Sequence, residues 1–222
     1  MSQRPEVLLS FAQSLDGQIA SKSGDSHWIS GDETLHLAHQ LRHDSDAILV
    51  GIGTVLRDDP ELSCRLPDTD RSPIRVILDS DLRLPHESRI VQTAARYPTV
   101  VVGAAGVSDE RRRALEAAGV TVLECPRDGD GLDLRRQLEL LHERGVKKLF
   151  VEGGSRVITA FIRRRLVDRM VLVIAPVIIG RATSAVLDLD TEFLSQAVRL
   201  IPGASRRIGQ DLVWELEFPG AP

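Results

Sequence analysis

Apolar, β-branched runs alternate with segments of helical periodicity along most of this chain, and that alternation constrains its fold more than any other feature. Strands are predicted over residues 7–14, 47–50, 74–78, 99–102, 120–123, 148–151 and 171–175. Helices are predicted over residues 31–42, 109–118, 132–144 and 155–165. Strands that alternate with helices form a mostly parallel sheet covered on both faces. The fold class is therefore α/β.

The last predicted element makes the sheet mixed. Residues 198–218 read as an antiparallel pair of strands that turns around Gly209. Ser30 and Glu33 form a capping-box pattern at the start of the first predicted helix. Residues 66–73, rich in Pro, Asp, Thr and Ser, are the one stretch expected to be flexible. We expect one domain over residues 1–222.

Composition and charge exclude several classes of protein. The longest apolar run, Met170–Ile179, is interrupted by Pro176, whereas a membrane span needs about 20 residues. The N-terminus lacks the pattern of a secretory signal, so a cytoplasmic protein is expected. A net charge of −4 and an aromatic content of 4% argue against a nucleic-acid binder. Cys64 and Cys125 lie far apart in the sequence, which predicts neither a disulfide framework nor a cysteine zinc site.

Two glycine-containing segments follow predicted strands, where ligands of such sheets bind. They are Gly51-Ile52-Gly53-Thr54 and Gly153-Gly154-Ser155, and the second opens a predicted helix. Glycines allow close backbone approach and helix-start amides attract phosphate, so two such loops suit one dinucleotide. Neither completes the G-x-G-x-x-G spacing, because Leu56 stands where a third glycine would be. Two ordinary tight turns explain the same residues equally well.

Polar residues follow other predicted strands. Ser80 and Arg83 come after the strand at 74–78 and suit the 2′-phosphate of NADPH, although a capped turn accounts for them nearly as well. Four acidic residues in turns or at strand ends suit sugar hydroxyls or proton transfer, and surface turns explain each one alone. They are Asp16, Asp58, Asp59 and Glu152.

Three histidines share one side of the first predicted helix. His36, His39 and His43 have spacings of i, i+3 and i+7. No Glu stands between them in zincin spacing, so an exposed polar face is the better interpretation and no metal site is predicted.

Taken together, a series of short motifs resembles one family, the pyrimidine reductase domain of riboflavin biosynthesis. The motifs, spread over residues 7–185 in the family's order, are Ser14-Leu15-Asp16-Gly17, Trp28-Ile29-Ser30, Gly53-Thr54-Val55-Leu56, Asp58-Asp59-Pro60, Arg75-Val76-Ile77-Leu78-Asp79-Ser80, Val151-Glu152-Gly153-Gly154 and Ala175-Pro176. So many ordered motifs are more specific than any one of them. The zinc deaminase signature that often accompanies this domain is absent, which predicts a stand-alone reductase.

The resemblance implies a dihydrofolate-reductase-like three-layer α/β/α fold, usually dimeric, and NADPH-dependent reduction of the ribosyl group of an aminopyrimidine ribosylamine 5′-phosphate to ribityl. It implies that NADPH is bound by Ala12, Trp28, Thr54, Asp58, Ser80, Gly153, Gly154, Ser155, Arg156 and Val157. It implies that the substrate is bound by Ser26, Arg42, Leu62, Arg65 and Glu152. Arg42 and Arg65 suit a sugar phosphate, and Glu152 suits ribose hydroxyls and a catalytic role. Arg65 as a loop charge and Trp28 as a core aromatic stay open as alternatives.

One position departs from the family's pattern. The family usually has Lys or Arg directly after Ser-Leu-Asp-Gly, whereas this chain has Gln18. Gln donates a hydrogen bond but supplies no charge and is no strong proton source. Asp16 is therefore the second candidate catalytic residue, as a substitute proton source.

The expected partners are a phosphorylated pyrimidine substrate and a second copy of the chain, with no nucleic acid and no membrane. The apolar segment 171–179 suggests the dimer contact, although a buried central strand explains it as well. Three alternative functions remain at this point: a pterin, dihydrofolate or pathway-specific pyrimidine reductase on the same fold, a non-catalytic NADP(H)-binding module, and a metal hydrolase built on the helix histidines. Arg42 and Arg65 favour a phosphorylated substrate over a folate.

Overall fold

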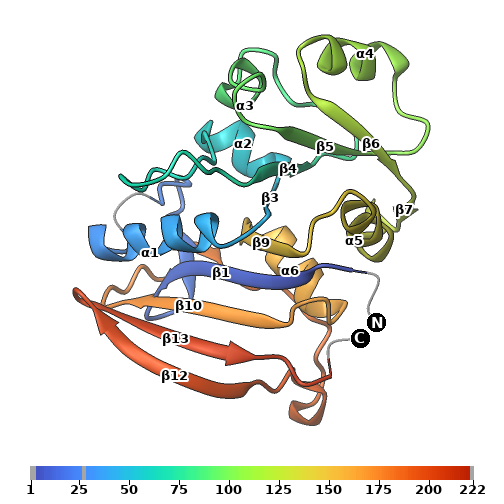
Figure 1. Ribbon diagram of the computed structural model, residues 1–222. Helices are drawn as coiled ribbons and strands as arrows, with labels where there is room; N and C mark the ends of the chain where they lie inside the picture. The colour runs from blue at the N-terminus through green and yellow to red at the C-terminus, as the bar shows by residue number, and fades with distance from the viewer. Residues whose placement is uncertain (1–3, 27–28, 221–222) are drawn as a thin grey trace. The chain divides into compact units, whose positions relative to one another are not determined.

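The computed structural model describes residues 4–26 and 29–220. The chain divides into two compact units (Figure 1). Unit 1 contains Met1–Glu6 and Gln40–Phe150, and unit 2 contains Val7–His39 and Val151–Pro222. Each unit has its own strands, helices and buried apolar residues, and each is described by itself.

The sheet of unit 1 is parallel. Its neighbouring strands are β3 (Ala47–Gly51), β4 (Ile74–Leu78), β5 (Thr99–Ala104) and β6 (Thr121–Cys125). Valine and isoleucine are frequent in β3, β4 and β5 because both faces of these strands are buried, as is usual for parallel strands. Arg75 is an exception, since this charged side chain lies within an apolar strand and is fully buried.

Helices and short strands complete unit 1. They are the last turn of α1 (Asp32–His43), then α2 (Ile52–Asp58), α3 (Arg89–Gln92), α4 (Asp109–Ala117) and α5 (Leu134–Glu143), with the hairpin of β7 (Arg127–Asp128) and β8 (Gly131–Leu132). Ser88, Ser108 and Asp133 cap the starts of α3, α4 and α5 with side-chain oxygens. Strand β9 (Lys148–Gly153) begins in unit 1 and ends in unit 2.

The sheet of unit 2 is mixed. Strand β1 (Glu6–Ser14) pairs in parallel with β10 (Arg169–Ala175), which pairs antiparallel with β13 (Asp211–Glu217). Strand β12 (Ile201–Ile208) pairs antiparallel with β13. The amphipathic helix α6 (Ser155–Arg163) buries Ile158 and Phe161. The remaining elements of this unit are the pair β2 (Gln18–Ala20) and β11 (Thr183–Ser184), and the 3-10 turn η1 (Leu194–Gln196).

Most sequence predictions of the fold are confirmed. All predicted strands and the four predicted helices are present, and β12 and β13 form the predicted antiparallel pair around Gly209. Residues 66–73 contain no helix or strand. Two short helices, α2 and α3, were not predicted. They contain seven and four residues, which is too short for a clear helical periodicity.

The start of α1 differs from the local capping prediction. The Asp211 carboxylate, from β13, accepts hydrogen bonds from the Gly31 amide at 2.9 Å and the Thr34 hydroxyl at 2.7 Å. Asp211 is buried and lies far away in the sequence. A distant residue therefore caps this helix, and the local Ser30–Glu33 pattern could not reveal it.

Candidate active site

In unit 1, polar residues gather where two neighbouring parallel strands end. Gly51 at the end of β3 lies beside Leu78 at the end of β4. Helix α2 begins directly after Gly51 and carries Thr54, whose side chain is half-buried, while Ser80 follows Leu78. The fold therefore brings two predicted cofactor residues, Thr54 and Ser80, to one edge of the unit 1 sheet. Asp58, at the end of α2, is exposed and pairs with Arg57 at 3.0 Å.

A buried carboxylate shapes the turn that carries Ser80. Asp79 is fully buried, and its Oδ2 accepts a hydrogen bond from the Leu84 amide at 2.8 Å. The Ser80 carbonyl accepts from the Ala104 amide of β5 at 3.1 Å. Burial raises the pKa of Asp79. Arg83, which the sequence suggested as a phosphate ligand, lies 3.6 Å from Asp79 Oδ1 with half of its side chain exposed.

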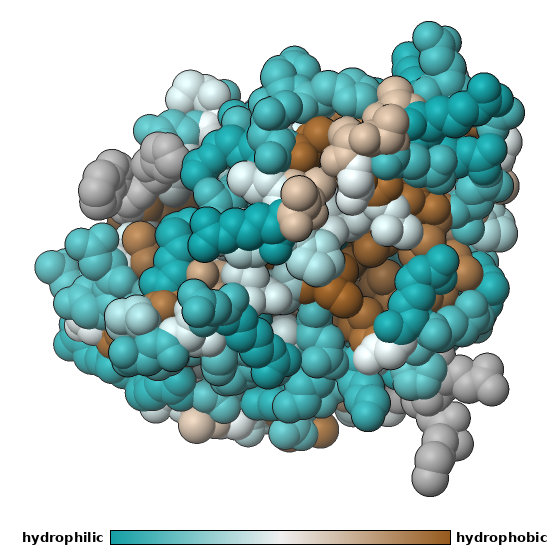
Figure 2. All heavy atoms as spheres, turned by 45° about the horizontal axis from the view of Figure 1, so that its top comes forward, coloured by the Kyte–Doolittle hydropathy of each residue, from teal (hydrophilic) through white to brown (hydrophobic). Residues whose placement is uncertain are grey.

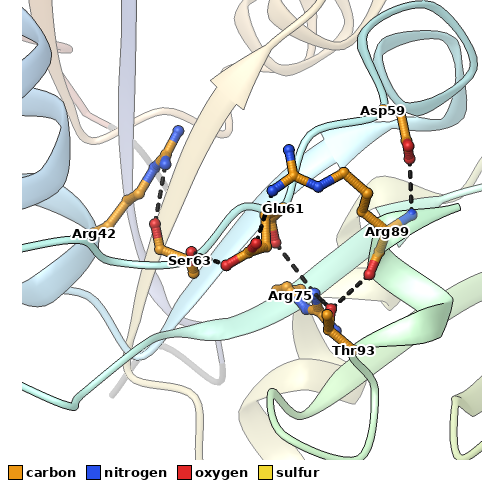
Figure 3. Close-up of polar contacts among 7 residues, drawn as sticks. All are labelled: Arg42, Asp59, Glu61, Ser63, Arg75, Arg89 and Thr93. Carbon is orange, nitrogen blue, oxygen red and sulfur yellow. Dashed lines mark hydrogen bonds and ion pairs between the residues drawn. The ribbon is translucent and has the colours of Figure 1, made fainter.

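The three predicted substrate residues of unit 1 also lie in neighbouring segments. Arg42, in the last turn of α1, is buried and donates from Nη1 to the Ser63 carbonyl at 3.1 Å. Ser63 follows Leu62, which is buried, and Arg65 is exposed two residues further on. The Arg42 guanidinium is thus attached to the segment that contains Leu62 and Arg65 (Figure 3).

Sequence reasoning missed the residues that organise this segment. Glu61 accepts hydrogen bonds from Ser63 and Arg89, and its carbonyl accepts one from Arg75. Glutamate and serine in an irregular stretch give no signal in a single sequence. Arg75 does give one, because a charged residue inside the apolar run Ile74–Leu78 needs buried hydrogen-bond partners.

In unit 2, Asp16 binds a turn. Its Oδ1 accepts from Ser14 Oγ at 2.6 Å and from the Ile179 amide at 3.1 Å, while Oδ2 accepts from the Gly180 amide at 2.7 Å. The Ser14 hydroxyl, then these amides, lower the pKa of Asp16. Asp16 is therefore ionised at neutral pH and holds the 177–180 segment. The role of Asp16 as a proton source stays a prediction, and the structure shows its carboxylate bound to Ser14 and two amides.

Gln18, the residue that differs from the family's pattern, also binds backbone groups. Its Nε2 donates to the Asp16 carbonyl at 3.0 Å, and its Oε1 accepts from the Ala182 amide at 3.3 Å. Both ends of the side chain are thus engaged with backbone groups of unit 2. Gln18 stabilises the approach of β2 to the segment before β11.

Two consecutive glycines link β9 to α6. Gly153 and Gly154 have φ angles of 121° and 88°, a region that glycine adopts far more readily than other residues. A Cβ on Gly153 would lie 3.2 Å from the Ile158 side chain. The N-cap residue of α6, Gly154, has no side chain that could cap the helix, so the first amides of α6 can face an anion. Glu152 comes directly before the glycines and is half-buried.

The predicted residues at the start of α6 differ in what they expose. Arg156 is exposed. The Val157 side chain is buried, so Val157 can offer a ligand only its main-chain amide. Ser155 Oγ donates to the Ser184 carbonyl at 2.5 Å. Ala12 on β1 and Ser26 are half-buried. Trp28, the remaining predicted cofactor residue, lies outside the described residues.

Within residues 4–26 and 29–220, no cluster of three or more His, Cys, Asp or Glu side chains has the arrangement of a metal site. Both cysteines are buried free thiols. Burial raises the pKa of Cys125 to about 11. No helix in the described part of the chain is both long and apolar enough to cross a membrane. The face drawn in Figure 2 consists mostly of hydrophilic side chains.

The architecture is that of the dihydrofolate-reductase-like α/β proteins. The chain superimposes on dihydrofolate reductase from Enterococcus faecalis with a TM-score of 0.53 at 14% identity over 97% of each chain, which shows the fold alone. It superimposes on RibD from Acinetobacter baumannii with a TM-score of 0.86 at 29% identity, over 99% of this chain and 59% of that one. The model of the RibD C-terminal domain matches residues 5–214. The chain belongs to the RibD C-terminal domain family.

Two curated relatives define what this similarity covers. The chain is 36% identical to the riboflavin biosynthesis protein RibD of Aquifex aeolicus over 95% of its own length and 57% of that protein. It is 37% identical to the 2,5-diamino-6-ribosylamino-4(3H)-pyrimidinone 5′-phosphate reductase of Methanothermobacter thermautotrophicus, over 98% of its own length and 100% of that protein. The chain thus spans little more than half of RibD.

Proposed function

We propose that this protein is an NADPH-dependent reductase that converts the ribosyl group of a ribosylaminopyrimidine 5′-phosphate to ribityl. The observation that carries the proposal is the match over its full length to a relative named as such a reductase. The candidate substrates are the 2,5-diamino-6-ribosylamino-4(3H)-pyrimidinone 5′-phosphate of that relative's name and its deaminated counterpart, 5-amino-6-(5-phosphoribosylamino)uracil. The site residues of each unit support the proposal separately.

The start of α6 in unit 2 fits the phosphates of a dinucleotide. The glycine pair gives close backbone access, and the uncapped amides of Ser155, Arg156 and Val157 present donors together with the positive end of the helix dipole. In unit 1, Thr54, Asp58 and Ser80 offer hydroxyl and carboxylate groups to the cofactor, and Ala12 and Trp28 complete the proposed set. NADPH supplies a hydride when bound.

The substrate residues have separate tasks. Arg42 and Arg65 of unit 1 neutralise the sugar phosphate, because guanidinium groups match phosphate in charge and geometry. Leu62 is buried and lies in the same segment as Arg65, and it packs against the apolar part of the ligand. In unit 2, Glu152 and Ser26 bind ribose hydroxyls. Glu152 remains the proposed catalytic residue, as the group that orients the reacting carbon.

The proposed reaction balances without a metal ion or further reductant. The ribosylamine opens to an imine, C1′ accepts the hydride with its two electrons, and the adjacent nitrogen accepts one proton. Bound NADPH would supply this hydride and would thereby become NADP⁺. Because the Asp16 carboxylate is bound to the 177–180 turn, the proposal takes this proton from water.

Consumption of NADPH by the purified protein, followed through its near-ultraviolet absorbance with each pyrimidine in turn, tests the proposal. We expect oxidation with at least one form, and a loss of about 100-fold or more in kcat/KM in Glu152→Gln. Glu139→Gln is the matched control, because this exposed carboxylate pairs only with Arg136 in α5 of unit 1. NADPH binding without oxidation of either form would instead support a binding module.

We also propose that the protein is a homodimer and that the outer face of the unit 2 sheet makes the contact. By strand register, Leu172, Ile174, Trp214 and Leu212 lie on one face, and none of them is fully buried. Ile178, beyond the end of β10, is 73% exposed. The sequence predicted a dimer contact over the whole segment 171–179. Val171, Val173 and Ala175 are buried, so the proposed contact includes only the other residues of this segment.

Light scattering of the protein as it elutes from a size-exclusion column measures its mass and tests the proposed dimer. We expect twice the chain mass for the natural sequence and the chain mass for Ile174→Asp, because a carboxylate on an apolar contact face carries a large desolvation cost. Leu56→Asp is the control, since Leu56 is half exposed on α2 of unit 1. A monomeric natural protein would refute the proposal.

A further inference from the structure

The segment that follows α2 contains a strained residue. Leu62 has a φ of 57°, in the left-handed region that branched side chains rarely adopt, and it is only 2% exposed. A residue persists in this conformation only when its surroundings fix it. Two anchors hold the segment, and both act on Glu61, the residue before Leu62 (Figure 3).

The first anchor is the main-chain carbonyl of Glu61. Arg75 Nη1 donates to it at 3.1 Å and to Thr93 Oγ1 at 2.8 Å. The other donors of the buried guanidinium bind the carbonyls of Ile90 and Tyr97 and the hydroxyl of Thr99. A rigid, planar group therefore fixes the position of Glu61 relative to β4 and α3.

The second anchor is the Glu61 carboxylate. Ser63 Oγ donates to Oε1 at 2.6 Å, and Arg89 Nη2 donates to Oε2 at 2.8 Å. The Ser63 hydroxyl, together with the positive charges of Arg89 and Arg65, lowers the pKa of Glu61, which is therefore ionised at neutral pH. The bond from Ser63 to Glu61 spans Leu62 and closes the strained turn.

Ser63 connects Glu61 to Arg42 through two hydrogen bonds. Its hydroxyl is bound to Glu61, while its carbonyl accepts the bond from Arg42 Nη1 at 3.1 Å. Ser63 is fully buried and Arg42 is 9% exposed, so neither group has water as an easy alternative partner. The direction of the Arg42 guanidinium thus depends on the turn that Glu61 closes.

We propose that Glu61 is a positioning residue: with its carbonyl fixed by Arg75 and its carboxylate bound to Ser63, it holds the Leu62 turn and thereby orients Arg42 for the phosphate of the substrate. Glu61 itself does not contact the substrate. The inference rests on the proposed function, which assigns Arg42 and Arg65 to the sugar phosphate. It predicts that Glu61 controls affinity for phosphorylated ligands and leaves the cofactor unaffected.

The test compares Glu61→Ala with two matched variants in steady-state kinetics. Glu61→Ala leaves Ser63 without its acceptor, and we expect the KM of the phosphorylated pyrimidine to rise roughly tenfold, with kcat and the KM of NADPH within about twofold of the natural protein. Glu61→Gln keeps an oxygen acceptor for Ser63, so the same KM stays within roughly threefold. Arg89→Gln removes only the exposed ion pair, and its KM stays within about twofold.

Three results would overturn the inference. They are an unchanged substrate KM in Glu61→Ala, an equal rise in the KM of NADPH, and an effect of Arg89→Gln as large as that of Glu61→Ala. If Glu61→Ala fails to fold, Ser63→Ala takes its place, because it removes the other end of the same hydrogen bond.

Calorimetric titration with ribose 5-phosphate separates this inference from the proposed function. If the natural protein reduces neither pyrimidine, the proposed function fails, and the inference then stands if ribose 5-phosphate binds roughly tenfold more weakly to Glu61→Ala. It falls if ribose 5-phosphate binds both proteins equally or binds neither. If the natural protein is active and Glu61→Ala is unchanged in both assays, only the inference fails.

Discussion

The two units hold their candidate functional residues by different physical means. In unit 1, buried side chains do this: Arg75 binds the Glu61 carbonyl, and the Ser63 carbonyl binds Arg42. In unit 2, backbone conformation does it, through the positive φ angles of Gly153 and Gly154. Removal of one donor weakens a side-chain network, because its acceptors lose a hydrogen bond. A glycine turn is instead strained when a Cβ atom is added.

The acidic residues of the two units differ in the same way. Asp79 of unit 1 is fully buried, and burial raises its pKa. Asp16 of unit 2 receives three hydrogen bonds, from Ser14 and two amides, which lower its pKa. Burial thus disfavours the anion of one carboxylate, whereas hydrogen bonds stabilise the anion of the other. The changes below test these contrasts in order of expected size.

The largest effect is expected from Arg75→Met in unit 1. Methionine has a similar length but no donors, so the carbonyls of Glu61 and Ile90 lose their Arg75 partner and that of Tyr97 keeps only the Thr99 hydroxyl among the described residues. An orphaned buried acceptor costs about 1–3 kcal/mol, so we expect the free energy of unfolding to fall by roughly 3 kcal/mol or more. Urea denaturation measures it. Arg75→Lys keeps the charge without the fork and should lose less; equal losses would show that the hydrogen bonds of the guanidinium, and not its charge, stabilise the unit.

A smaller effect is expected from Gly153→Ala in unit 2. Alanine at this φ is strained, and its Cβ would lie 3.2 Å from Ile158, so the free energy of unfolding should fall by about 1–3 kcal/mol and NADPH should bind more weakly. Thermal unfolding and a fluorescence titration with NADPH measure both.

Gly53→Ala in unit 1 is the matched control for that change. Gly53 lies within α2, and a Cβ there would meet no atom within 4 Å, so stability should rise by about 0.5–1 kcal/mol. A loss of NADPH affinity in this stable variant would indicate that the cofactor itself fills the space beside Gly53. Equal destabilisation by both substitutions would contradict the contrast between the units.

The sequence was sufficient for most of the fold, because the fold depends on local patterns. Alternating runs specify β3, β4 and β5, and the motif Glu152-Gly153-Gly154 marks the turn before α6. The links between segments could not be predicted. Arg42 meets Ser63 only after folding, and the cap of α1 comes from Asp211, 180 residues beyond Gly31.

The functions of acidic residues were the least predictable part. A carboxylate in a turn looks the same in a sequence whether it donates a proton, binds a ligand or accepts backbone amides. Asp16 accepts hydrogen bonds from the amides of Ile179 and Gly180, which lie on a distant segment, and no local pattern indicates these bonds. Glu61 gave no signal, although the structure places it at the centre of the Arg42 network.

The smallest effects are expected from Asp79→Asn and Asp16→Asn, and they should have opposite signs at neutral pH. Because the folded-state pKa of Asp79 is raised, the natural protein loses stability as pH rises from 3.8 through that pKa, and asparagine removes this loss. Because the folded-state pKa of Asp16 is lowered, its contribution is fully present above 3.8 and disappears as pH falls through the folded value. Asp79→Asn should therefore be stabilising at neutral pH, and Asp16→Asn destabilising there but not in acid.

Thermal unfolding of the three proteins across the acid range measures this difference. Asp79→Asn keeps an oxygen for the Leu84 amide, so its gain in Tm reports the removed charge and not a lost hydrogen bond. Curves for both variants that run parallel to that of the natural protein would show that neither carboxylate differs in pKa between the folded and unfolded states. The contrast between a carboxylate whose anion is disfavoured by burial and one whose anion is stabilised by hydrogen bonds would then not hold.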